Sequence, residues 1–329
     1  MKKSVKITCI VAASCIVLGL LILLGVSIKF GFDYRNLNTT TAEVKTYTVE
    51  QAFENIDIHS LSNNVEFSAA DGEQCKVVCT ETARTACAVS VENGTLTVTQ
   101  KDTRRWYEHF GIYWETDDTS EMKIEVFLPL LPEYRDLSVT TQSGDVFVGE
   151  PFGFETADLS TTSGNIDFGS AVNKLSLHST SGNITCQKIS MATSVKAETT
   201  SGNVELSKIS TMDLSASTTS GNLNLFEIYA TGDAVLESAS GASRLEKTTA
   251  KSFKITTTSG DIRFKDADAD MLRIQSNSGC VKGNLLSEKN FEVATTSGDV
   301  DIPHPPRYDE NAGICTVITT SGDITLHTP

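Results

Sequence analysis

Sequence motifs that would indicate an enzyme are missing from this chain. It contains no Gly-x-Ser-x-Gly nucleophile motif, no phosphate-binding loop and no dinucleotide-binding fingerprint. Histidine is scarce, and the histidines show neither the helical spacing of a metal site nor a partnering Cys-x-x-Cys motif: they are His59, His109, His178, His304 and His327. We therefore expect no catalytic residue, no cofactor and no bound metal.

The signatures of calcium-binding loops are also missing. Residues 266–270 alternate Asp and Ala like the start of a calcium loop, but the glycine and the closing glutamate of an EF-hand do not follow. The glycine-rich nonapeptide of calcium-binding β-rolls is absent as well. We expect residues 266–270 to form a solvated turn between strands.

The chain has fewer basic than acidic residues. Of the 27 Lys and Arg residues, four lie at positions 2, 3, 6 and 29, so the remaining 300 residues carry 23 against all 42 Asp and Glu, a net charge of −19. Such an acidic surface argues against nucleic acid and anionic lipid as partners. Cationic peptides, basic proteins and metal cations stay open as partners, and the simplest interpretation is a surface that keeps the protein soluble.

The N-terminal region lacks charge over a long run. Lysines at positions 2, 3 and 6 precede residues 7–28, which contain no charged residue, and Lys29 ends the run. About 20 apolar residues suffice to cross a bilayer, and lysines on the short side favour a cytoplasmic N-terminus. A cleavable signal peptide is the alternative, but its apolar region would be shorter, and no small-residue cleavage site follows. We expect a cytoplasmic tail over residues 1–6 and a transmembrane helix over 7–28, with an extracytoplasmic ectodomain.

What the chain does have is a repeat. Residues 161–166, Thr-Thr-Ser-Gly-Asn-Ile, return with small changes from about residue 137 onward, and eight of the nine intervals between the repeated glycines are 18 to 20 residues. A period of this length is typical of a solenoid. The repeated glycines are Gly144, Gly164, Gly182, Gly202, Gly221, Gly241, Gly260, Gly279, Gly298 and Gly322.

Each repeat alternates apolar and polar residues on both sides of its glycine. The positions seven and five before the glycine are apolar in every copy, as in Leu175 and Leu177. The positions two and four after it are each apolar in nine of the ten copies, as in Ile166 and Phe168. Alternation with a period of two predicts β-strands. We therefore predict an all-β protein, a parallel β-solenoid of about ten coils of 18–20 residues.

The Ser-Gly pair is interpreted as a corner between two short strands. Glycine would supply a positive φ there, which a Cβ would penalise. Asp or Asn follows the glycine in eight of ten copies and would hydrogen-bond nearby backbone amides in an Asx turn. The Thr or Ser three residues before the glycine would form a ladder of hydroxyls that bond to one another along the stack. With a coil spacing of about 4.8 Å, ten coils would make a rod of about 48 Å.

The segment before the repeats is rich in strand patterns but less regular. Residues 56–67 match the repeat with Asn63 in the position of the glycine, where asparagine best tolerates a left-handed conformation. The pair Asn93-Gly94 between alternating residues predicts a hairpin. The predicted divisions of the chain after the membrane helix are a linker over 29–44, a β-rich N-terminal cap over 45–131 and the solenoid repeats over 132–329.

Two insertions interrupt these patterns. Residues 101–120 hold both tryptophans of the chain, and residues 303–313 lengthen the last interval between glycines to 24 residues. Aromatic insertions can be binding loops, but they can also pack as a small core over the end of a solenoid. The candidate partner-binding residues are Trp106, Tyr107, Phe110, Tyr113 and Trp114.

Six of the eight cysteines lie outside the predicted membrane helix. Cys186 and Cys315 occupy inward-facing positions of the repeat and are interpreted as small buried apolar residues. Cys79 and Cys87 could bridge a hairpin, but their spacing does not specify a disulfide.

Three features together resemble a known family: the repeated Thr-Thr-Ser-Gly-Asp/Asn-Val/Ile units, the strand ending Phe127-Leu128-Pro129 and the N-terminal anchor. The family is the bacterial "putative adhesin" group of β-strand repeat proteins, a domain-of-unknown-function family of the cell envelope. The resemblance covers about residues 50–329. It implies an envelope-associated, non-catalytic protein, with some relatives linked to envelope-stress responses, and it supplies no catalytic residue to carry over.

Two functions remain as hypotheses. The first is a membrane-anchored extracytoplasmic β-repeat protein that acts non-catalytically in adhesion, envelope scaffolding or envelope-stress sensing, with an envelope protein, a cationic peptide or a glycan as partner. The alternative is a polysaccharide-acting β-helix enzyme, because parallel β-helices can host lyases and hydrolases. Such enzymes build a saccharide cleft from long loops on successive coils, whereas coils of 18–20 residues leave room for little beyond strands and corners.

Overall fold

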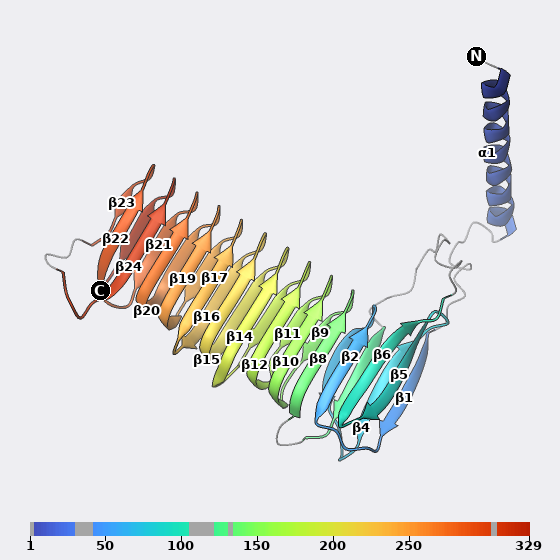
Figure 1. Cartoon of the computed structure of the whole chain (residues 1–329), viewed down its shortest axis with the longest axis horizontal. Coiled ribbons are helices and arrows are strands. Elements are labelled where there is room, and N and C mark those ends of the chain that lie inside the picture. Colours follow the sequence, from blue (N-terminus) through green and yellow to red (C-terminus); the bar gives the residue numbers. More distant parts are fainter. Residues whose placement is uncertain (1–2, 30–41, 105–121, 131–133, 304–307) are drawn as a thin grey trace.

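The computed structural model describes residues 3–29, 42–104, 122–130, 134–303 and 308–329, which form one helix and a long β-solenoid (Figure 1). Helix α1 spans Lys3–Lys29. The strands among the described residues are β1 (Glu43–Val49), β2 (Asn55–Ser60), β3 (Asn64–Ala69), β4 (Cys75–Glu81), β5 (Thr85–Glu92), β6 (Thr95–Asp102), β7 (Lys123–Leu128), β8 (Tyr134–Thr141), β9 (Val146–Val148), β10 (Gly153–Thr161), β11 (Ile166–Phe168), β12 (Ala171–Ser179), β13 (Ile184–Gln187), β14 (Ala192–Thr199), β15 (Val204–Thr218), β16 (Leu223–Ala230), β17 (Asp233–Ser238), β18 (Ser243–Glu246), β19 (Thr249–Thr257), β20 (Ile262–Ser276), β21 (Val281–Leu285), β22 (Lys289–Thr295), β23 (Val300–Asp301), β24 (Gly313–Thr319) and β25 (Ile324–His327). The predicted all-β solenoid behind an N-terminal apolar helix is confirmed.

Helix α1 exposes apolar side chains to its surroundings. Residues 11–29 have a mean hydropathy of 2.7, and Leu20 and Leu23 are 62% and 59% exposed. A helix of this length and composition suits either a membrane span or a signal sequence.

The solenoid has two main walls, and each is a column of parallel strands in register. Strands β8, β10, β12 and β14 are neighbours in one wall, and β9, β11 and β13 are neighbours in the other. Strands β15 and β20 continue around a corner, so that each contributes one half to either wall. Within the first wall Leu159 pairs with Val139 on one side and with Leu177 on the other.

The predicted inward positions form the core between the walls. Side chains such as Leu177, Ile166 and Phe168 are at most 1% exposed, and they stack on their counterparts in the coils above and below. Cys186 and Cys315 are fully buried in the same column, as their inward positions indicated. Removal of this apolar surface from water is the main favourable term in folding the rod.

The corner glycines are required for steric reasons, and the predicted requirement for a positive φ was wrong. Among the described residues the glycines with a positive φ are Gly94 and Gly283, and none of the repeated corner glycines shares that conformation. Instead, a Cβ built on Gly202 would overlap the carbonyl oxygen of Gly182 in the preceding coil. The same overlap with a preceding carbonyl recurs at the other corners. Glycine is therefore required because two backbones approach too closely to admit a side chain.

The hydroxyl three residues before each glycine bonds to backbone groups. Ser179 Oγ accepts a hydrogen bond from its own corner's Gly182 N–H (2.8 Å) and donates one to the Gly164 carbonyl of the preceding coil (3.0 Å). The predicted hydroxyl ladder is therefore present in position, but its members mostly bond to glycine backbone and not to one another. The contact between Thr295 and Thr319 (3.1 Å) is an exception.

The Asp or Asn after the glycine forms a second ladder on the outside of the corner. Asn165 Oδ1 accepts the Asn183 N–H (2.9 Å), and Asn183 Oδ1 accepts the Asn203 N–H (2.9 Å) of the next coil. These bonds run between coils, whereas the predicted Asx turn would have closed within one coil. Both ladders have the same direction, because each coil supplies acceptors to the coil that follows it.

The second corner of several coils places a non-glycine residue at positive φ. Lys208 (φ 55°) and Asp266 (φ 54°) bend strands β15 and β20 without ending them. Residues 266–270, for which a turn was expected, are therefore part of β20, and that expectation was wrong. A left-handed residue can redirect a strand while the neighbouring parallel strands continue their pairing.

The N-terminal end of the rod is built by chain reversal. Strands β6 and β7 add a coil beside β2 and β3. The chain then reverses: β5 pairs antiparallel with β6, β4 pairs antiparallel with β7, and β1 pairs antiparallel with β4. The predicted hairpin at Asn93-Gly94 joins β5 to β6. Asn63 takes the glycine position beside Gly144 without a positive φ, so the reason given for asparagine there was wrong. Its side chain instead donates to the Thr80 carbonyl (2.8 Å).

The C-terminal coils do not stack in chain order. Strand β24 pairs with β20 on one side and with β22 on the other, so the last repeat in sequence lies between two earlier ones. Lys289, whose side chain is buried, forms an ion pair of 2.8 Å with the half-buried Asp268 across this arrangement. The ion pair is a contact between chain segments that repeat periodicity does not reveal.

We expect Gly202→Ala to lower the free energy of unfolding by about 1–3 kcal/mol through overlap with the Gly182 carbonyl. Gly202→Asn should be at least as harmful, because asparagine relieves strain at positive φ but not a steric overlap. Thermal unfolding of both variants, with Ser201→Ala as a control at the same corner, measures this. An asparagine variant that is clearly more stable than the alanine variant would contradict the steric explanation.

Candidate functional site

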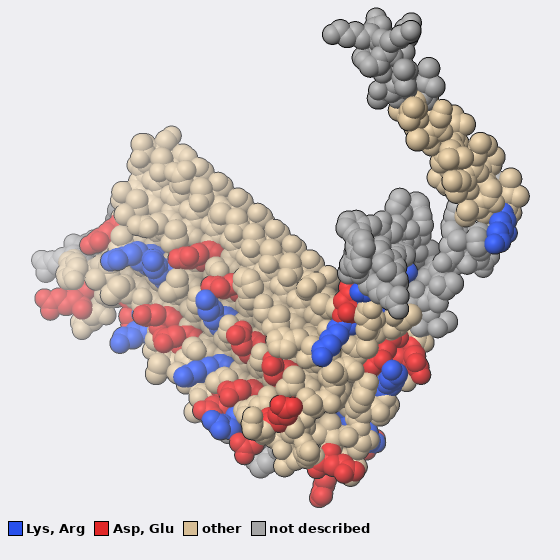
Figure 2. Space-filling view, turned by 45° about the vertical axis from the view of Figure 1, so that its right-hand side comes forward, with Lys and Arg blue, Asp and Glu red and all other residues tan. Residues whose placement is uncertain are grey.

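The described walls of the rod hold no cluster of side chains suited to a metal ion. Across the described residues no group of three or more His, Cys, Asp or Glu side chains is placed to hold a metal ion. In Figure 2, Lys and Arg lie mixed with Asp and Glu over the lower of the two visible surfaces of the rod, whereas the upper surface is nearly free of charged residues. Several of these pair, including Lys265 with Glu246 (2.6 Å). The lower surface therefore shows no patch of a single charge sign.

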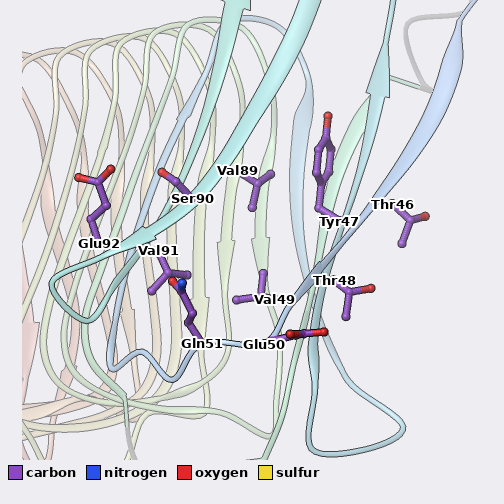
Figure 3. A pocket seen from close by; sticks show the side chains of 10 residues that line it. All are labelled: Thr46, Tyr47, Thr48, Val49, Glu50, Gln51, Val89, Ser90, Val91 and Glu92. Atoms are coloured by element: carbon purple, nitrogen blue, oxygen red, sulfur yellow. The ribbon is translucent and has the colours of Figure 1, made fainter.

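A groove lies at the N-terminal end of the rod, between β1 and β5 (Figure 3). It has a volume of about 640 Å³. Val49, Val89 and Val91 project from the two strands toward the space between them. Polar and acidic side chains lie around these valines. The lining residues are Thr46, Tyr47, Thr48, Val49, Glu50, Gln51, Val89, Ser90, Val91 and Glu92.

Both strands that border the groove are edge strands. In the described part of the chain β1 pairs with β4 alone, and β5 pairs with β6 alone. Each strand therefore presents one row of backbone N–H and C=O groups that no described strand uses. Unpaired edges of this kind can accept an additional strand from another polypeptide. The groove thus combines open backbone with an apolar floor.

A buried carboxylate holds the groove's two strands together. Glu81 is 4% exposed and accepts hydrogen bonds from Lys45 Nζ (2.6 Å) and the Tyr47 hydroxyl (2.7 Å), both on β1. It also accepts the backbone N–H of Cys87 on β5 (3.1 Å). Burial alone would raise the pKa of Glu81, but these hydrogen bonds outweigh burial and lower the pKa below its ordinary value of 4.5. Burial, followed by the bond to Glu81, raises the pKa of Tyr47.

Two thiols adjoin this carboxylate. Cys79 and Cys87 are free in the structure, and the hydrogen bond between them together with burial raises the pKa of Cys79. The disulfide that the sequence left open is therefore not formed, although the two residues are neighbours. Cys79 contributes to the core as a small buried side chain.

The aromatic residues predicted to bind a partner, Trp106, Tyr107, Phe110, Tyr113 and Trp114, lie outside the described residues. In the sequence these residues lie between β6 and β7. Strand β6 pairs with β5, but its last residue, Asp102, lies opposite Thr85, whereas the groove is lined by the other end of β5, Val89 to Glu92. Sequence reasoning missed the groove itself, because its walls come from strands about 40 residues apart whose meeting no repeat predicts.

The chain is similar to a described family. A family model named Toastrack DUF4097 matches residues 53–241 and, in a second match, residues 213–329. No curated protein matches the chain.

Several solved structures are similar to the chain over most of their length. One is described as a "putative adhesin" from Bacteroides fragilis, with 12% identity, a TM-score of 0.41, and coverage of 87% of this chain and 97% of that one. Another is described as a "putative lipid binding protein" from Parabacteroides distasonis, with 14% identity, a TM-score of 0.44, and coverage of 86% and 96%. A third is a "putative adhesin" from Parabacteroides merdae, with 12% identity, a TM-score of 0.36, and coverage of 89% and 97%.

We expect Glu81→Gln to lower the free energy of unfolding by about 1–3 kcal/mol at neutral pH, because Lys45 and Tyr47 lose a charged acceptor. The folded pKa of Glu81 is lowered, so its contribution is present above pH 4.5 and is lost as the pH falls below that value. The difference between the native protein and the variant should therefore shrink in acid. Urea unfolding at pH 7 and pH 3.5 measures this, with Glu92→Gln at the exposed groove rim as the control. An equal loss in both variants, or a loss independent of pH, would refute the assignment.

Proposed function

Because this chain belongs to the Toastrack DUF4097 family, we propose that it is a membrane-anchored, non-catalytic rod that binds an envelope partner. Family membership confirms the resemblance seen in the repeated corners. The observation that carries the proposal is the joining of one apolar helix to a rod whose described surface offers a groove between two edge strands. Adhesion, envelope scaffolding and envelope-stress sensing are the roles compatible with such a rod.

Helix α1 supports the proposal that the chain is anchored in a membrane. Residues 11–29 are strongly apolar on average, with a mean hydropathy of 2.7, and 6% of them are buried, so the helix has no protein core to pack against. A hydrocarbon layer would cover this surface. The lysines at positions 2, 3 and 6 favour a cytoplasmic N-terminus, which puts the rod on the opposite side.

If α1 is an uncleaved anchor, the chain stays in the membrane fraction after a high-salt wash and keeps its original N-terminus. A peripheral protein would leave the membrane as salt screens its charges, whereas a spanning helix is held by apolar contacts. Fractionation followed by mass spectrometry of the intact chain measures both properties. A mature N-terminus near residue 27 would show that α1 is a removed signal sequence.

The groove supports the proposal that the rod binds a partner. An extended segment lying between β1 and β5 could hydrogen-bond either open edge and place apolar side chains on Val49, Val89 and Val91. Glu50 and Glu92 at the rim favour a cationic segment. Trp106 and Trp114, the predicted aromatic anchors, lie between β6 and β7 in the sequence, and we propose that they contact the same partner.

A photoreactive amino acid in place of Ser90 should capture a discrete partner in intact membranes that contain the full-length chain. The same substitution at Asp158, an exposed position on a middle strand of the rod, should not capture it. Adding Trp106→Ala and Trp114→Ala to the Ser90 variant should reduce the yield at least several-fold, because buried aromatic anchors are each worth about 2 kcal/mol. Identical products from both positions, or degradation of a polysaccharide by the purified chain, would overturn the proposed function.

A further inference from the structure

The last coil of the rod in space is formed by β22 and β23, at the end opposite the groove (Figure 1). Strand β22 pairs with β24, and β23 pairs with β25. No described strand pairs with the other edge of either one. Both strands of the end coil therefore have one edge that pairs with no described strand.

The core is exposed at this coil. Val300 is 45% exposed, whereas Ile324 and Val281, its counterparts in the next two coils, are fully buried. Phe291 and Val293 are half-buried, although the matching Cys315 and Val317 are fully buried. The interior column thus ends in apolar surface that a further coil would cover.

The hydrogen-bond ladders are open at the same place. Asp299 N–H donates to Asp323 Oδ1 (3.2 Å), and Thr295 Oγ1 donates to the Gly322 carbonyl (3.3 Å). Since each coil supplies acceptors to the next, the Gly298 carbonyl and the Asp299 carboxylate are the acceptors that the next coil would use. No described residue occupies that place. At this end the corner therefore has hydrogen-bond acceptors that no described donor uses.

The opposite end of the ladder is closed by the chain itself. Gln100 occupies the hydroxyl position of its coil, and its Oε1 accepts the Leu61 N–H (2.8 Å), the Ser62 N–H (3.2 Å) and the Ser60 hydroxyl (3.0 Å). Its Nε2 donates to Asn63 Oδ1 (2.8 Å). The donor end of the ladder is thus capped, and the acceptor end has no comparable device among the described residues.

The exposed charges of the open coil are all negative. Glu288, Glu292, Asp299 and Asp301 are exposed, whereas the side chain of Lys289 is 2% exposed and paired with Asp268. Two such ends facing each other would bring carboxylates together, and like charges directly opposite are destabilising. The charge therefore disfavours a second copy and favours a cationic occupant.

We propose that the C-terminal end of the rod binds an extended, cationic segment of a partner polypeptide as an additional parallel strand. The segment places apolar residues at alternate positions against Phe291 and Val293 or against Val300. Its intervening Lys or Arg side chains lie beside Glu292 or Asp301. Backbone pairing gives affinity, and the alternation of apolar and cationic residues gives specificity.

The test measures binding of a labelled synthetic peptide, Lys-Ile-Lys-Val-Thr-Thr-Ser-Gly-Asn-Val-Lys-Ile, to the full-length chain in nanodiscs. Two comparison peptides are used, one with every lysine replaced by glutamate and one with the same residues in an order that breaks the alternation. Only the first peptide should bind, and its affinity should fall with salt because the rim contacts are charged.

The decisive variant is Glu292→Lys/Asp301→Lys, with Asp158→Lys/Glu205→Lys as its matched control at the same two coil positions in the middle of the rod. The end variant should bind the lysine peptide about tenfold more weakly, as expected for two exposed ion pairs turned repulsive, and should gain binding of the glutamate peptide. The mid-rod control should bind like the native chain.

Equal weakening in both variants, no binding of any peptide, or equal binding of the peptide with broken alternation would overturn the proposal. A concentration-dependent dimer of the native chain that is altered by the end variant would assign the surface to a second copy instead. Crosslinking through Ser90 concerns the other end of the rod, so this proposal and the proposed function can fail separately.

Discussion

The approach of each corner glycine to the glycine of the preceding coil is the constraint on which the rest of the rod depends. The carbonyl oxygen of Gly182 lies where a Cβ of Gly202 would have to be. Coils can pair at strand spacing on both walls only if this position carries no side chain. Once the constraint is met, the neighbouring hydroxyl can bond to the glycine N–H of its own coil and to the carbonyl before it, as Ser179 does. The regular interval between glycines keeps each corner in this column.

The direction of the two ladders makes the ends of the rod chemically different. A coil gives acceptors to the following coil and donors to the preceding one, so an isolated stack has a donor end and an acceptor end. Gln100 and Asn63 close the donor end with side-chain amides, which supply both acceptors and donors. The acceptor end keeps Gly298 and Asp299 open and adds exposed carboxylates. The middle of the rod, where backbone groups pair with neighbours on both sides, offers fewer such features.

The Toastrack DUF4097 chain therefore concentrates its irregular features at the rod ends. At one end, edge strands β1 and β5 border a groove and are joined through Glu81. At the other, the outer edges of β22 and β23 have no described neighbour. Walls built from short coils give stiffness and length, whereas binding needs surface that is not already paired. This division suits the proposed role of a rod that holds two binding surfaces apart.

Repeat periodicity by itself determined the strands, the inward residues and the stacking, because each of these depends on residues close together in one coil and on its copies. Leu177 and Cys186 could be placed in the core on this basis alone. Tertiary structure decided why the corners are glycine, since the overlap involves a backbone about 20 residues away and leaves no local signal in φ. It also decided that β24 lies between β20 and β22, because the coils have nearly the same sequence pattern and only contacts such as Lys289 with Asp268 distinguish their order. The groove belongs to this second group, since β1 and β5 meet only after the chain has reversed.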